Sequence, residues 1–295
     1  MSYLLPLLTV LIWAGNTLVT KASAGAIGPS EIGFYRWLLA ALLFTPFLIL
    51  PVWRNRAAIK PVLGKVIVLA ALGMALFQSL AYFAAGITSA TNMAIIPSLI
   101  PIMALLMASV VLGSQLTWGA LIGALISVAG VLEVVSAGHI GNLAHQGLNL
   151  GDAMLLLAAL AFAVYSILLR KWQLRLPPLQ LLYLQAVAAT IMLLPMFLLT
   201  PRVGLNMHNI ALVLYAGIPT SMLAPLLWMQ SIARLGPERT TLFFNLLPIV
   251  TVVAAALILG EQLASFHLLG GGLTLAGVIL AERWRTPLRP VALQP

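Results

Sequence analysis

The chain of 295 residues is 62% hydrophobic and only 7% charged, whereas soluble domains use about 25% charged residues. This composition, with a mean hydropathy of +1.09, excludes a soluble globular domain. The net charge of +9 does not indicate nucleic-acid binding, because the basic residues cluster in short loops and at the C-terminus instead of forming one stripe. The absence of cysteine excludes disulfides, thiolate chemistry and cysteine-ligated zinc.

The chain begins MSYLLPLLTVLIWAG, with neither a basic n-region nor a small-residue cleavage site, so we expect a retained first helix rather than a signal peptide. A helix needs about 20 apolar residues to cross about 30 Å of hydrocarbon. The sequence contains ten such stretches and therefore predicts an all-α integral membrane protein with ten transmembrane helices. In chain order they cover residues 3–20, 29–50, 66–86, 92–112, 117–137, 153–169, 179–200, 210–230, 240–259 and 264–281.

The distribution of Lys and Arg predicts the orientation, since these residues are retained in cytoplasmic loops. With the N-terminus in the cytoplasm, twelve of the 15 basic residues fall on the cytoplasmic side. They are Arg54, Arg56, Lys60, Lys65, Arg170, Lys171, Arg175, Arg234, Arg239, Arg283, Arg285 and Arg289. The opposite side holds only Lys21 and Arg202, and Arg36 lies within the second stretch. Both termini are therefore predicted to be cytoplasmic.

An internal repeat relates the two halves of the chain. An offset of 149 residues aligns Pro29 with Pro178, and an offset of 147 overlays residues 99–116 on residues 246–263. Proline and glycine at fixed offsets are much less expected by chance than coincidences of Leu and Ala. The boundary falls in the polar, glycine-rich connection at residues 138–152.

The repeat divides a single membrane domain, residues 1–295, into five-helix halves at 1–140 and 141–295. Because five is odd, the second half enters the membrane from the opposite side, and the repeats are inverted. Inverted repeats recur in secondary transporters, whose substrate site lies at the repeat interface near the bilayer midplane. Transport is therefore the default function.

Three short motifs carry a resemblance to a known family. They are Trp13 to Asn16 (WAGN), the Pro-Ile pairs at Pro101 and Pro248, and Leu259 to Glu261 (LGE), which the first half replaces by Leu-Gly-Ser-Gln at 112–115. On these motifs, nearly the whole chain resembles the EamA-type members of the drug/metabolite transporter superfamily, and among them the YddG-type amino acid exporters. The resemblance implies alternating-access export of small metabolites, mainly aromatic or hydrophobic amino acids, across a bacterial inner membrane. It also implies a central cavity lined by helices 1, 3, 4, 6, 8 and 9, with helices 5 and 10 more peripheral.

Polar side chains in hydrocarbon are costly unless they face a partner or a wet cavity, so mid-membrane amides and hydroxyls are the first candidates for a substrate site. Aromatic rings beside them would form an apolar slot. The predicted substrate-binding residues are Trp13, Asn16, Phe77, Gln78, Tyr82, Ser98, Pro101, Phe162, Tyr165, Asn245 and Pro248. For the amides, the alternative is a purely interhelical hydrogen bond. For the aromatic residues it is packing or an interfacial belt, which we prefer for Trp228.

Pro101 and Pro248 are the most specific local signal. A proline inside a helix leaves the carbonyl four residues earlier without its amide partner, here at Pro97 and Phe244. These carbonyls could bind a substrate amino group. The alternative is a kink stabilised by neighbouring helices or water.

Arg36 lies about 10 Å inside the second helix, at about 1.5 Å per residue. It could bind a carboxylate, but the second helix is expected to be peripheral, so we prefer snorkelling or pairing with Glu31. All six acidic residues are predicted near helix ends or in loops. Because ion-driven carriers usually need a buried carboxylate or histidine, we expect movement of substrate down its own gradient.

Two other function classes compete with export. A membrane-embedded enzyme acting on a lipid or isoprenoid would need clustered acids, metal ligands or a nucleophile with a histidine partner, and no such motif occurs. A receptor subunit has no need of inverted repeats. An uptake carrier for another small metabolite stays open. We therefore expect no catalytic residue, no metal and no cofactor. The expected partners are a small-molecule substrate and the lipid bilayer, without nucleic acid, and the expected state is a monomer.

Overall fold

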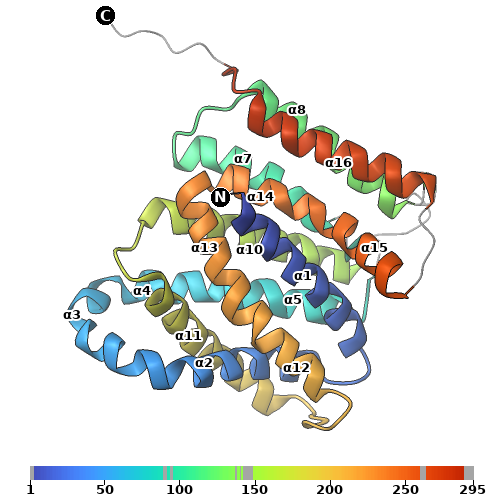
Figure 1. Cartoon of the computed structure of the whole chain (residues 1–295). Coiled ribbons are helices and arrows are strands. Elements are labelled where there is room, and N and C mark those ends of the chain that lie inside the picture. Colours follow the sequence, from blue (N-terminus) through green and yellow to red (C-terminus); the bar gives the residue numbers. More distant parts are fainter. Residues whose placement is uncertain are drawn as a thin grey trace, which may run out of the picture.

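The computed structural model describes residues 3–88, 92–93, 96–136, 138–139, 141, 149–259 and 264–288, and within them the elements are helical, apart from one isolated bridge between Thr117 and Pro287. The elements are α1 (Leu4–Ser23), α2 (Pro29–Arg54), α3 (Arg56–Ile59), η1 (Lys60–Val62), α4 (Leu63–Leu69), η2 (Ala70–Leu76), α5 (Phe77–Ala84), η3 (Ile96–Leu99), α7 (Ile100–Val111), α8 (Trp118–Val135), α10 (Leu150–Trp172), α11 (Pro178–Leu199), α12 (Ile210–Gly217), η4 (Pro219–Leu223), α13 (Ala224–Leu235), α14 (Pro237–Leu242), η5 (Phe243–Asn245), α15 (Leu246–Leu259) and α16 (Ser265–Arg283). Figure 1 shows their arrangement.

Each of the ten predicted stretches contains helix in the structure. Among the described residues, six helical runs are long and apolar enough to cross a membrane: Pro29–Arg54, Arg56–Ala84, Trp118–Val135, Leu150–Trp172, Pro178–Leu199 and Ile210–Leu235. Three shorter apolar helices are Leu4–Thr20, Ile96–Val111 and Ser265–Ala281. The prediction of an all-helical membrane protein is confirmed.

The sequence predicts the sixth helix at residues 153–169, but α10 runs from Leu150 to Trp172. The predicted helix is therefore too short at both ends. The start of α10 is a capping box, in which the Asn149 side chain accepts from the Asp152 amide and the Asp152 carboxylate accepts from the Asn149 amide. Polar capping residues satisfy the first free amides of a helix. In a hydropathy pattern they resemble a loop, and this displaced the predicted boundary.

Irregular helical segments occur at matching places in the two halves. The π-helical segments η2 and η4 begin at residues 70 and 219, which are 149 apart, and the 3-10 segments η3 and η5 begin at residues 96 and 243, which are 147 apart. These are the two offsets that align the sequence. Pro219 opens η4, where its missing N–H and its ring disfavour regular α-helical bonding.

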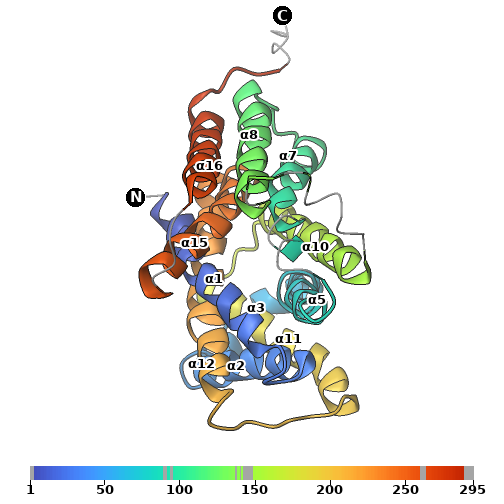
Figure 2. The same ribbon diagram turned by 90° about the vertical axis from the view of Figure 1, so that its right-hand side faces the viewer.

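The helices α8 and α16 lie side by side as an outer pair (Figures 1 and 2). Glycines bring their backbones into contact: a Cβ added at Gly123 would lie 2.4 Å from the Gly277 carbonyl oxygen, and one at Gly130 would lie 2.5 Å from that of Gly270. Small residues at such positions let membrane helices approach closely. Gly272, on the same helix as Gly277, faces open space instead.

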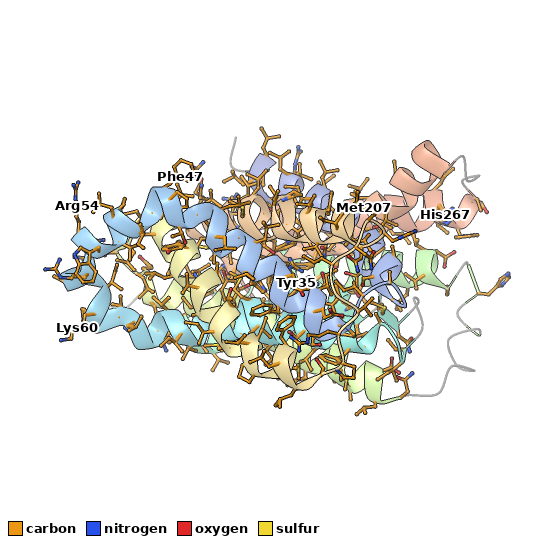
Figure 3. The ribbon with its side chains drawn as sticks, turned by 90° about the horizontal axis from the view of Figure 1, so that it is seen from below. Tyr35, Phe47, Arg54, Lys60, Met207 and His267 are labelled. Carbon is orange, nitrogen blue, oxygen red and sulfur yellow. The ribbon has the colours of Figure 1, made fainter. Side chains whose placement is uncertain are left out.

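The loops that carry most basic residues meet at one end of the molecule. The Arg170 guanidinium at the end of α10 donates a hydrogen bond of 2.7 Å to the Ala233 carbonyl near the end of α13. Figure 3 shows Arg54 and Lys60 at one end of the structure and His267 toward the other. We call the end with Arg54, Lys60 and Arg170 the basic end.

Candidate functional site

A cavity of about 500 Å³ lies among the helices of both halves. Sites for small ligands usually measure about 300–1,000 Å³, so this cavity has room for a single small metabolite. It reaches the end of the molecule opposite to the basic end, where Val135 closes α8 and His267 lies in the first turn of α16.

Four aromatic side chains from α1, α10, α13 and η5 form one wall of the cavity. We call Trp13, Phe162, Trp228 and Phe244 the aromatic cluster. The Trp13 ring centroid lies 5.8 Å from that of Phe162, 5.1 Å from that of Trp228 and 5.3 Å from that of Phe244. Aromatic pairs attract one another at centroid separations of about 4.5–7 Å. The cluster is therefore a well-packed apolar surface that is suited to a ring or a branched aliphatic group.

The cavity wall includes eight of the eleven predicted substrate-binding residues. They are Trp13, Asn16, Phe77, Gln78, Ser98, Phe162, Tyr165 and Pro248. The other three, Tyr82, Pro101 and Asn245, are buried behind the wall. That any of these residues binds substrate stays a prediction, but the structure brings most of them to one place.

Asn245 is held by a neighbouring helix. It is 0% exposed, and its Nδ2 donates a hydrogen bond of 2.9 Å to the Ser127 hydroxyl on α8. This is the geometry of an interhelical hydrogen bond, the alternative open for this amide in the sequence.

Pro101 and Pro248 lie directly after 3-10 segments. Pro101 follows η3 at the start of α7, and Pro248 follows η5 at the start of α15. Because η3 adjoins α7, and α14 and η5 adjoin α15 without a break, each proline lies in a continuous helical run where 3-10 geometry changes to α geometry. A proline lacks the N–H that regular α-helical bonding needs, which agrees with this irregularity. That the Pro97 and Phe244 carbonyls bind a substrate stays a prediction.

Four cavity-lining residues carry buried polar atoms that have no hydrogen-bond partner among the described residues. These atoms are Asn16 Oδ1, Tyr165 OH, Thr220 Oγ1 and Trp228 Nε1. Most buried polar groups are hydrogen-bonded, and each one left unpaired costs about 1–3 kcal/mol. The four residues come from α1, α10, η4 and α13 and all line the cavity, which makes these atoms candidate positions for bonding to a ligand or water.

Trp228 corrects the sequence interpretation. It was expected in the interfacial belt, but it is 1% exposed and belongs to the aromatic cluster. The predicted helix ended at residue 230, whereas α13 continues to Leu235. The additional residues place Trp228 about 10 Å inside the helix end, at about 1.5 Å per residue.

Arg36 and the second helix also differ from expectation. The first half of α2 is buried, and its outward residues, such as Phe47 (76% exposed), lie further along the helix (Figure 3). Arg36 is 2% exposed and lines the cavity. Its Nε donates to the Ser221 hydroxyl at 2.8 Å, and its Nη1 donates to the Tyr82 hydroxyl at 3.1 Å. The expected snorkelling of Arg36 is therefore wrong, because the first half of α2 turns this side chain into the bundle.

The expected pairing of Arg36 with Glu31 is wrong as well. The Glu31 carboxylate accepts hydrogen bonds from the backbone amides of Gly28, Val203 and Gly204 at 3.1, 2.9 and 2.8 Å. These amides belong to the start of α2 and to the loop after α11. Glu31 therefore ties a loop to a helix start and is committed away from Arg36.

Phe244 and Trp37 also line the cavity. The sequence pointed to Phe244 only through its backbone carbonyl, not its ring, and did not point to Trp37. Phe244 aligns with Pro97 at the offset of 147, so the repeat offered no aromatic equivalent to point to it. Trp37 follows Arg36 on the helix that was expected to be peripheral. The sequence did not predict either ring at the cavity, because this depends on the orientation of the helix and not on the residue type.

A bundle of apolar helices around a central cavity is the architecture of a membrane transporter. The EamA-like transporter family matches this chain at residues 1–136 and again at residues 149–282. The chain therefore belongs to the EamA-like transporter family and is a multi-pass membrane protein.

The chain is similar over almost its whole length to several transporters. The uncharacterized transporter YyaM of Bacillus subtilis is 27% identical over 94% of this chain and 92% of its own length. An uncharacterized transporter of Archaeoglobus fulgidus is 29% identical, covering 95% and 96%. A probable terminal-alkyne amino-acid exporter of Streptantibioticus cattleyicolor is 26% identical, covering 94% and 91%. A crystal structure with a TM-score of 0.74 and 17% identity, covering 95% of this chain and 96% of the other, shares the fold.

Proposed function

We propose that this protein is a secondary transporter that exports aromatic or hydrophobic amino acids by alternating access through the central cavity. The observation that carries the proposal is the pairing of the aromatic cluster with unpartnered polar atoms in one cavity of about 500 Å³. An amino acid with an apolar side chain matches both features: its side chain suits the aromatic cluster, and its amino and carboxyl groups suit the unpartnered polar atoms. The similarity to a probable amino-acid exporter supports the same substrate class.

The proposal includes ten membrane crossings in two inverted repeats, with both termini in the cytoplasm of a bacterium. Two separate family matches and the repeated π and 3-10 segments support the repeat. The positive-inside rule assigns the basic end to the cytoplasm. The cavity then opens to the outside of the inner membrane, as in a state that has just released its cargo or waits to return.

The proposed transport is not driven through a buried carboxylate. In the part of the chain that the structure describes, no Asp or Glu side chain lines the cavity. The cavity lining includes one histidine, His267, whose Nδ1 accepts a hydrogen bond from the Ala264 amide at the start of α16. We propose that a monomer moves substrate down its own gradient, without cofactor, metal or nucleic acid.

Counterflow in liposomes tests transport. Purified protein is reconstituted, the vesicles are loaded with unlabelled L-phenylalanine, and entry of labelled L-phenylalanine is followed against protein-free vesicles. We expect transient accumulation of label that L-leucine competes with. If no amino acid of a full panel exchanges, the proposal is wrong.

A growth assay separates export from uptake. Cells that overproduce the protein are exposed to a toxic analogue such as 4-fluorophenylalanine. An exporter lowers the internal concentration and raises the tolerated dose, whereas an uptake carrier lowers it. Greater sensitivity would replace export by the uptake alternative.

A further inference from the structure

Arg36 is a buried cation whose hydrogen-bonding capacity is only partly used. A guanidinium carries five N–H donors in a planar fork. The two hydrogen bonds, to Ser221 and Tyr82, leave three N–H groups without a bond to any described residue. Because Arg36 also lines the cavity, its free donors are available to a molecule bound there.

The partners of Arg36 do not neutralise its charge. Both are hydroxyl groups, and the Trp37 and Tyr82 rings, with centroids 5.3 and 5.9 Å from the Arg36 Cζ, add only cation–π attraction. Glu31 is engaged with three backbone amides, and no acidic residue of the described chain lines the cavity. A buried charge is normally paired, so this cavity lacks a counter-anion.

The fork of Arg36 is held in a fixed orientation. The Ser221 hydroxyl accepts from Nε and donates its own proton to the Ala216 carbonyl at 2.7 Å. Tyr82 holds Nη1 from the side of α5. Contacts from two other helices therefore position the guanidinium before any ligand arrives, which lowers the entropy cost of binding.

We infer that Arg36 binds the carboxylate of the transported molecule. This inference rests on the proposed function and narrows it: the cargo carries a carboxylate, and organic cations are excluded. An arginine fork matches the two oxygens of a carboxylate. The unpartnered Thr220 hydroxyl, next to Ser221 in the sequence, and Asn16 Oδ1 are then available to the amino group, while the side chain meets the aromatic cluster.

Binding in detergent, without transport, tests the inference. Three tryptophans line the cavity, so intrinsic fluorescence reports occupancy, and calorimetry provides an independent readout. The probes are L-phenylalanine, L-phenylalaninamide, 2-phenylethylamine and 3-phenylpropionate. We expect wild-type protein to bind L-phenylalanine about 30-fold more tightly than its amide, within the range for losing one partner of a buried charged pair. This comparison needs no substitution.

Arg36→Gln should remove that preference, with about 30-fold weaker binding of L-phenylalanine and little change for the amide. Arg36→Lys should recover part of the affinity, because it keeps the charge but loses the fork. Arg202→Gln is the matched control: Arg202 is exposed and stacks on Phe197, with Cζ 5.2 Å from the ring centroid. We expect it to bind like the wild type.

Thermal unfolding without ligand separates binding from a structural role. A charge that waits for its counter-ion does not stabilise the empty protein, so the Tm of Arg36→Gln should equal or exceed that of the wild type. A lower Tm with unchanged preference for the carboxylate would overturn the inference, as would equal wild-type binding of L-phenylalanine and its amide. If the wild type binds 3-phenylpropionate through Arg36 but no amino acid, the carboxylate site holds and the proposed amino-acid substrate fails.

Discussion

The α8–α16 pair and the cavity region are built from equally apolar helices, yet they bury polar atoms in opposite ways. In the pair, glycine backbones touch directly, and none of its described residues carries a buried polar side-chain atom without a partner. Around the cavity, four such atoms and the Arg36 charge lack full pairing. The protein itself satisfies the polar side-chain atoms of the α8–α16 pair, whereas polar atoms at the cavity have no partner among the described residues.

Close backbone contact between α8 and α16 gives dispersion energy that membrane helices need, because lipid supplies no hydrophobic drive between them. The helices do not make such contacts where they border the cavity, and each unpaired polar atom there lowers the free energy of unfolding. Substitutions in the two regions should therefore separate stability from binding.

The largest effect is expected at the glycine contact. Gly123→Val places side-chain atoms against the Gly277 carbonyl, which is backbone and cannot rotate away. Overpacking of this kind costs about 3 kcal/mol, or a Tm lower by about 10 °C. Size-exclusion after heating measures it, with Gly272→Ala as the control because that Cβ meets nothing within 4 Å. Equal stability of the two variants would contradict the packing comparison.

A pair of tryptophans gives the next largest effect. The Trp228 indole N–H has no partner, whereas that of Trp37 donates to the Met74 carbonyl at 3.1 Å. Trp228→Phe and Trp37→Phe both remove part of a buried ring. Trp228→Phe should lower the Tm by that loss alone and weaken binding of L-phenylalanine by about tenfold, or 1.4 kcal/mol. Trp37→Phe should cost about 1 kcal/mol of stability more, because it also removes the hydrogen bond to the Met74 carbonyl. If Trp228→Phe destabilises as much as Trp37→Phe, the N–H is not reserved for a ligand.

The smallest effect is expected where the two regions meet. Asn245→Ala removes the hydrogen bond to Ser127, which costs about 0.6–1 kcal/mol, and should change ligand affinity less than twofold. Ser127→Ala should cost the same free energy of unfolding, because it removes the same hydrogen bond. The double variant should be no less stable than either single variant. Weaker binding in Asn245→Ala alone would return Asn245 to the substrate site.

The helices, and the eight of eleven predicted site residues that line the cavity, follow from local chemistry. An apolar stretch of sufficient length partitions into hydrocarbon regardless of its neighbours. Amides and hydroxyls such as Asn16, Gln78 and Tyr165 are costly in lipid, and this cost predicts that they face inward. The π and 3-10 segments were not predicted, but their starts are separated by the same two offsets that align the sequence.

Tertiary structure decided which of two permitted environments each ambiguous side chain occupies. The sequence allows Arg36 either to snorkel or to face a cavity. It allows Trp228 to lie either in an interfacial belt or in an aromatic cluster. Asn245 can meet a ligand or, as observed, Ser127 on α8. The tilt and rotation of a membrane helix are set by packing against its neighbours. Length and hydropathy are therefore enough to predict a helical membrane protein, whereas the position of Arg36 at the cavity follows from how the helices pack.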